Sequence, residues 1–120
     1  MHTYKDLIVW QKSVELVVAV YTLTEGFPRE EIYGLTAQMR RSAVSIPSNI
    51  AEGKLRRAEK ELRQFLLIAF GSGGELETQI IIAKKLPMTS KLDYLKVDIL
   101  LNEIMKMLNK MVFRTLAPNA

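Results

Sequence analysis

The chain has 120 residues, of which 48% are hydrophobic and 25% charged, a composition typical of a soluble globular domain and not of a disordered chain. The chain contains no cysteine, which excludes disulfides, thiol nucleophiles and zinc fingers. Its one histidine is His2, so neither a Ser-His-Asp triad nor a histidine metal site is expected. The net charge of +4 allows an anionic partner. We therefore predict one domain over residues 1–120 that is not an enzyme and uses no cofactor, metal or small-molecule substrate.

The chain shows no pattern of a membrane or exported protein. Its longest apolar runs, residues 16–21 and 65–70, have six residues each, far fewer than a membrane span needs. The first residues contain no long apolar stretch followed by small residues, as a signal peptide would. We therefore expect a cytoplasmic protein with no membrane partner.

The first predicted helix covers about residues 4–24 and carries two apolar stripes at helical spacing. One stripe is assigned to the bundle core: Leu7, Trp10, Val14, Val17, Val18 and Tyr21. The other stripe is assigned to an oligomer interface: Val9, Leu16, Val20 and Leu23. The reason is that a four-helix bundle of this size has no room to enclose a helix on all sides. The alternative is that both stripes are buried inside one domain.

The second predicted helix begins at Pro28, which suits a first helical turn, and ends at Gly53. Its apolar seam advances in steps of three and four: Ile32, Leu35, Met39, Ala43, Ile46 and Ile50. Pro47 lies inside this seam and lacks an N–H group, so we predict a helix that is kinked near Pro47 and not a loop. Three polar residues are placed to bond the groups that the proline leaves free: Ser45, Ser48 and Asn49.

Two more helices are predicted over about residues 58–86 and 91–114, and the short connections favour antiparallel neighbours. The predicted fold is therefore all-α, an up-down-up-down four-helix bundle. The third helix contains Gly71, Gly73 and Gly74, which each cost about 1 kcal/mol relative to alanine, so we predict close approach of a neighbouring helix there. A phosphate-binding loop is the weaker interpretation, because no strand precedes these glycines and no Gly-Lys-Ser/Thr follows them.

Basic residues are concentrated in one part of the chain. Residues 40–63 hold seven basic and three acidic side chains, whereas residues 1–39 and 64–83 are each net negative. The basic residues are Arg40, Arg41, Lys54, Arg56, Arg57, Lys60 and Arg63. Three of them are spaced at i, i+4 and i+7 and are therefore expected on one face of the third helix: Arg56, Lys60 and Arg63.

Two interpretations of this cluster stand side by side. Five of the seven residues are arginine, which favours phosphate contact and hence binding of RNA or DNA. The alternative is a solvated face that Glu52, Glu59 and Glu61 partly neutralise. No aromatic residue interleaves the cluster, so stacking of unpaired bases is not expected.

Four stretches of the chain carry a family resemblance: residues 6–12, residues 27–35 with Phe27-Pro28 and Tyr33-Gly34-Leu35, residues 38–53, and residues 65–69 followed by Gly71-Ser72 and Glu75–Gln79. Together they resemble the bacterial four-helix bundle proteins named after the 23S rRNA intervening sequences that encode some members. The resemblance implies a ring-shaped homopentamer of four-helix bundles, in a family largely of unknown function. A related group, the accessory variability determinant of diversity-generating retroelements, is a basic pentamer that works with a reverse transcriptase and nucleic acid.

The sequence thus predicts a non-enzymatic homo-oligomer, preferably a pentamer, that binds RNA or DNA through its basic face. The alternative function is that of a structural or adaptor oligomer with a protein partner and no nucleic-acid role. A binding affinity that falls with salt would separate the first from the second.

Overall fold

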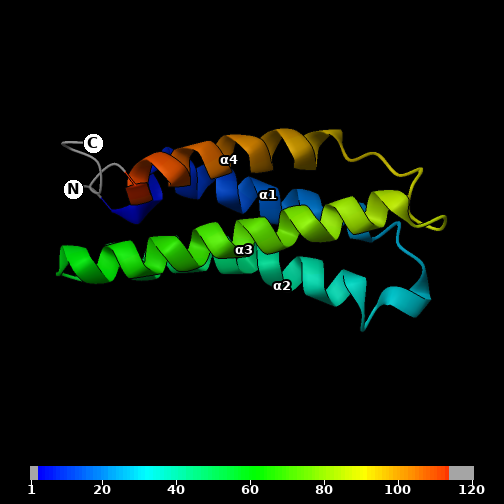
Figure 1. Cartoon of the computed structure of the whole chain (residues 1–120), viewed down its shortest axis with the longest axis horizontal. Coiled ribbons are helices and arrows are strands. Elements are labelled where there is room, and N and C mark those ends of the chain that lie inside the picture. Colours follow the sequence, from blue (N-terminus) through cyan, green and yellow to red (C-terminus); the bar gives the residue numbers. More distant parts are fainter. Residues whose placement is uncertain (1–2, 114–120) are drawn as a thin grey trace.

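The computed structural model describes residues 3–113, which form four α-helices and two short 3-10 turns (Figure 1). The helices are α1 (Ile8–Thr24), α2 (Leu35–Lys54), α3 (Glu59–Lys85) and α4 (Leu95–Phe113), and the turns are η1 (Tyr4–Asp6) and η2 (Arg29–Glu31). No strand occurs within these residues. The predicted all-α four-helix fold is confirmed.

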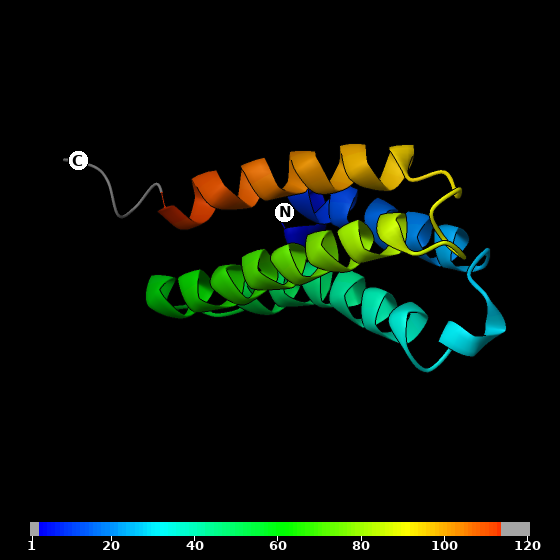
Figure 2. The ribbon, with the colours of Figure 1, turned by 45° about the vertical axis from the view of Figure 1, so that its right-hand side comes forward.

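The helices pack as a square in which each contacts two others. Helix α1 packs against α2 and α4, and α3 packs against the same two helices. The chain reverses direction after each helix (Figure 1), and α2 and α3 lie side by side along their length in both views (Figure 2). The turn between α2 and α3 extends past the end of α4 in Figure 1. The α2–α3 turn therefore projects beyond α4 at this end of the bundle.

Helix α1 faces the core with the stripe that the sequence assigned to an oligomer interface. The exposed fractions of these side chains are Val9 4%, Leu16 0%, Val20 0% and Leu23 8%. They are buried inside the single chain, because α2 and α4 cover this side of α1, so they are not available to another copy. The other stripe lies further out: Val14, Val18 and Tyr21 are exposed, whereas Leu7, Trp10 and Val17 are only partly buried. The predicted orientation of α1 is corrected accordingly.

Helix α2 begins at Leu35, later than predicted, because the helical conformation that starts after Pro28 is interrupted at Gly34. Pro28 leads only into η2, and Gly34, with φ −108° and ψ −114°, is the residue before α2. The Glu31 side chain caps the new start by accepting a hydrogen bond of 3.0 Å from the Leu35 N–H. Ile32 therefore lies outside the helix and is 48% exposed, although the sequence placed it in the core seam.

The chain remains helical through Pro47, but the side-chain bonds of Asn49 go to Ser45 and not to the Ala43 carbonyl that the proline leaves without its N–H partner. Asn49 donates to the Ser45 carbonyl oxygen at 2.8 Å and to the Ser45 hydroxyl at 2.9 Å. Ser48 is exposed. Pro47 itself is buried and α2 continues beyond Gly53 to Lys54. The proline is thus accommodated within one helix, and the kink stays a prediction.

Close helix approach occurs at Gly53 and Gly73 and not at the other two predicted glycines. A Cβ atom on Gly53 would lie 2.9 Å from Phe65 Cβ, and one on Gly73 would overlap Met105 Sδ of α4. At Gly71 and Gly74 the same atom would meet nothing within 4 Å. The prediction of close approach is therefore right for Gly73 and wrong for Gly71 and Gly74. The absence of a side chain at Gly53 lets α2 pack closely against α3.

This difference predicts opposite effects of alanine at the two kinds of glycine. We expect Gly53→Ala to destabilise the fold by about 1–3 kcal/mol through overpacking against α3. Gly71→Ala and Gly74→Ala should stabilise it by up to about 1 kcal/mol each, since they improve helix propensity in open space. Urea unfolding followed by circular dichroism measures all three. A Gly53→Ala variant with a raised unfolding midpoint would contradict the close contact.

Among residues 3–113, α3 is the one helix long and apolar enough to cross a membrane, with a mean hydropathy of 1.3 over 18 residues. Of that window, 39% is buried inside the bundle. Core helices of soluble proteins have the same properties, so the helix is weak support for a membrane span. Packed in the bundle, α3 is consistent with a soluble protein, and the cytoplasmic location stays a prediction.

Candidate nucleic-acid interface

The seven predicted basic residues all lie on the α2–α3 hairpin, but they differ in what they contact. Arg40, Arg41 and Lys54 belong to α2, Arg56 and Arg57 to the turn, and Lys60 and Arg63 to α3. The expectation that Arg56, Lys60 and Arg63 share one face of a helix is wrong, because α3 begins only at Glu59. Three of the seven are held by other parts of the protein and four are not.

Arg40 connects α2 to the end of α1. Its Nε donates to Thr24 Oγ1 at 2.8 Å and its Nη2 to the Tyr21 carbonyl oxygen at 3.4 Å. The guanidinium also lies 4.4 Å from the centre of the Tyr21 ring. Arg40 therefore has a role in the fold, and its prediction as a phosphate ligand is not favoured by these contacts.

Arg56 is held within the turn. Its guanidinium lies 3.9 Å from Glu52 and 3.7 Å from Glu61, and 4.9 Å from the centre of the Phe65 ring. All three charged side chains are about half exposed, so these ion pairs contribute little stability. They nevertheless neutralise the Arg56 charge and position the α2–α3 turn.

Arg63 connects α3 to the end of α4. Its Nε donates to the Val112 carbonyl oxygen at 3.1 Å, across a sequence separation of 49 residues. This carbonyl belongs to the last turn of α4 as the structure describes it, where helix carbonyls lack a partner within the helix. Arg63 is thus a structural residue in the same sense as Arg40.

Four cations remain without a hydrogen bond or ion pair to any described residue: Arg41, Lys54, Arg57 and Lys60. All four are exposed. Lys54, Arg57 and Lys60 cluster at the end of the hairpin, and Arg41 lies further along α2. We call these four residues the free basic surface. It can contact anions without first breaking contacts within the protein.

The family of the protein follows from a match that includes residues of all four helices. The model of the 23S rRNA-intervening sequence protein family matches residues 5–110. The chain belongs to this family. Among curated proteins, none matches the chain. The resemblance inferred from the sequence is therefore confirmed at the level of the family.

In this member of the 23S rRNA-intervening sequence protein family, the matched residues include the whole hairpin and the free basic surface.

Within residues 3–113 no three histidine, aspartate or glutamate side chains gather to hold a metal ion. Burial raises the pKa of Tyr94, whose hydroxyl donates to the Thr89 carbonyl oxygen. Tyr94 lies before α4, at the end of the bundle opposite the α2–α3 turn (Figure 1), so it does not belong to the interface.

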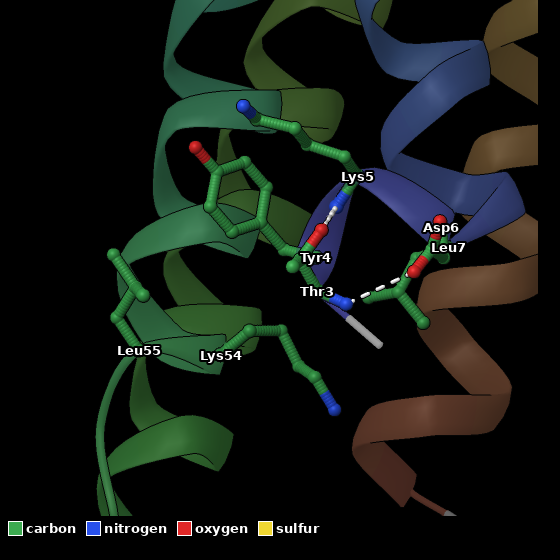
Figure 3. Close-up of a pocket in the computed structure, with 7 residues that line it drawn as sticks. All are labelled: Thr3, Tyr4, Lys5, Asp6, Leu7, Lys54 and Leu55. Atoms are coloured by element: carbon green, nitrogen blue, oxygen red, sulfur yellow. Dashed lines mark hydrogen bonds between the residues drawn. The ribbon is translucent and has the colours of Figure 1, made fainter. Parts of the chain in front are cut away.

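One neighbour of the candidate interface was missed by sequence reasoning. The first turn of the chain, η1, packs beside the end of α2 and places Tyr4 and Lys5 next to Lys54 and Leu55 (Figure 3). These residues line a cavity of about 580 Å³ together with Thr3, Asp6 and Leu7. The separation of about 50 residues along the chain hid this neighbour, because no local pattern links η1 to the end of the second helix.

Proposed function

We propose that the protein is a non-enzymatic homo-oligomer that binds the phosphate backbone of RNA or DNA through the free basic surface. The observation that carries this proposal is the division of the seven basic residues: two bond main-chain oxygens of other helices, one is paired with carboxylates, and four are exposed with no acidic partner among the described residues.

Such a surface binds the phosphate groups of the nucleic-acid backbone and not the bases. Each cation that neutralises a phosphate releases a condensed counterion, which favours binding and makes the affinity depend on salt. Arginine adds bidentate contact with phosphate oxygens. Nothing in the four helices resembles an element that reads base edges, so binding is expected to be independent of duplex sequence.

The ring of five copies that the family resemblance implies is part of the proposal. Five free basic surfaces in one assembly would add weak contacts by multivalency. The outer face of α1 is the surface we assign to contact between copies, in place of the buried stripe. Its exposed fractions are 37% for Val14, 62% for Val18 and 42% for Tyr21, which supports an apolar contact.

Two measurements on the unmodified protein test the proposal. Light scattering should give several times the 13.7 kDa mass of one chain, with five copies preferred. Fluorescence anisotropy with RNA, single-stranded DNA and duplex DNA should show an affinity that falls with salt, with a log–log slope near −0.9 per phosphate on duplex DNA. A folded monomer at micromolar concentration would overturn the oligomer, and absence of binding at about 50 mM salt would overturn the nucleic-acid role.

A structural or adaptor oligomer with a protein partner is the second candidate function. It is favoured by apolar side chains that α3 leaves exposed, Ile68 at 51%, Ile81 at 49% and Ile82 at 45%. A partner bound through these residues would give an affinity nearly insensitive to salt, since burial of apolar surface dominates such contacts. Salt dependence therefore distinguishes the two candidates.

A further inference from the structure

The cavity beside η1 combines an aromatic ring, an apolar wall and two cations (Figure 3). The Tyr4 ring lies between Lys5 on one side and Leu55 and Lys54 on the other. Leu55 is 68% exposed, so its side chain is available as the apolar wall of this cavity. The volume of about 580 Å³ lies within the range of about 300–1,000 Å³ that small-molecule sites have.

Local contacts hold the Tyr4 ring in place before any ligand arrives. The Trp10 ring meets it edge-on, with 5.3 Å between ring centres and 69° between ring planes. The η1 turn is fixed by reciprocal capping, in which Thr3 N donates to Asp6 Oδ2 at 3.0 Å and Lys5 N donates to Thr3 Oγ1 at 3.2 Å. The Gln11 amide adds a bond of 2.9 Å to the Lys5 carbonyl oxygen. The ring is therefore a preorganised platform.

The charges around the ring favour an anion. Lys5 and Lys54 line the cavity from separate elements, and neither side chain has a hydrogen bond or ion pair to a described residue. The one carboxylate that lines the cavity, Asp6, is engaged in capping η1. Lys54 also belongs to the free basic surface, so the cavity continues the surface that we assign to phosphates.

We infer that this cavity receives one unpaired nucleotide of a single strand, with its base stacked on Tyr4 against Leu55 and its flanking phosphates near Lys5 and Lys54. The inference rests on the proposed nucleic-acid binding and specifies its substrate: a single-stranded segment, because a base inside a duplex cannot leave its stack without cost. The sequence had indicated no aromatic residue within the basic cluster. The fold supplies one from the start of the chain.

The test compares a short single-stranded RNA with a duplex of the same sequence, using fluorescence anisotropy at fixed salt. We expect Tyr4→Leu to weaken binding of the single strand by about 5- to 160-fold, the loss of one stacked base, and to leave duplex binding unchanged. Tyr4→Phe should retain the affinity for the single strand because it keeps the ring. Tyr33→Leu is the matched control, since Tyr33 is 96% exposed and lies in the connection between η2 and α2.

A second readout needs no variant. Trp10 is the one tryptophan of the chain and contacts Tyr4, so the single strand should change Trp10 fluorescence while the duplex, bound to equal saturation, should not. Equal effects of Tyr4→Leu on single strand and duplex, or no effect together with unchanged Trp10 fluorescence, would overturn the cavity assignment and leave the proposed function standing. Failure of the unmodified protein to bind either nucleic acid would overturn both.

Discussion

Leu16→Glu is expected to unfold the protomer. The Leu16 side chain is 0% exposed and lies in the middle of α1, packed between α2 and α4. An unpaired carboxylate there costs several kcal/mol in desolvation, in addition to the roughly 2–5 kcal/mol lost with leucine packing. Since a domain of this kind is stable by about 5–15 kcal/mol in total, the change removes most of the folding free energy. Circular dichroism should show loss of helix at 25 °C or a greatly lowered melting temperature.

Val18→Glu is the matched control, with the same charge introduced two residues away on the same helix. Val18 is 62% exposed, so its carboxylate stays in water and the helix content and melting temperature of the protomer should be retained. The variant should instead form smaller assemblies in light scattering, because α1 presents this residue at the proposed contact between copies. If Leu16→Glu melts like the unmodified protein, the buried orientation of α1 described above is incorrect.

Replacement of the whole free basic surface by glutamine should have the largest effect on binding. In the variant Arg41→Gln, Lys54→Gln, Arg57→Gln, Lys60→Gln, four phosphate contacts are lost, so the log–log salt slope on duplex DNA should fall in magnitude by up to about 3.6. Those contacts correspond to a change in affinity of roughly 100-fold between about 50 and 200 mM salt. The fold should be unchanged, because none of the four side chains bonds a described residue.

The control for net charge is a second quadruple variant with four other exposed lysines changed to glutamine: Lys85, Lys91, Lys96 and Lys106. Both variants lose four positive charges, so a general attraction would weaken binding equally in both. A local phosphate-binding surface predicts that the first variant loses far more affinity than the second. Equal losses would show that the cations of the hairpin act only through the net charge of the protein.

Much of the fold was predictable because the apolar spacing along the chain is unambiguous for most helices. The predicted seam of α2 illustrates this: Met39, Ala43, Ile46 and Ile50 are all 0% exposed. In α1 the same reasoning failed, since two stripes of similar hydropathy lie on opposite sides and periodicity alone does not tell which one faces inward. The choice depends on which side α2 and α4 cover, and that is a tertiary property.

The candidate interface was likewise predictable only in part, because its contacts depend on tertiary structure. Its location on the α2–α3 hairpin follows from charge placement in the sequence, but the division between structural and free cations does not. Arg63 is structural because the Val112 carbonyl oxygen, 49 residues away, lies within reach of its side chain. Tyr4 lies beside the candidate interface for a comparable reason, since η1 packs against α2. Contacts between residues so far apart in the chain leave no local signal.

The two arginines that anchor the hairpin also determine how the bundle opens. Arg40 and Arg63 bond carbonyl oxygens at the carboxyl ends of α1 and α4, the negative poles of the two helix dipoles. Helix ends normally fray independently, but here each last turn is held by a cation carried on the hairpin. We therefore expect loosening of α1 or α4 at these ends to be coupled to movement of α2 and α3, so that amide hydrogens near the two bonds exchange at similar rates.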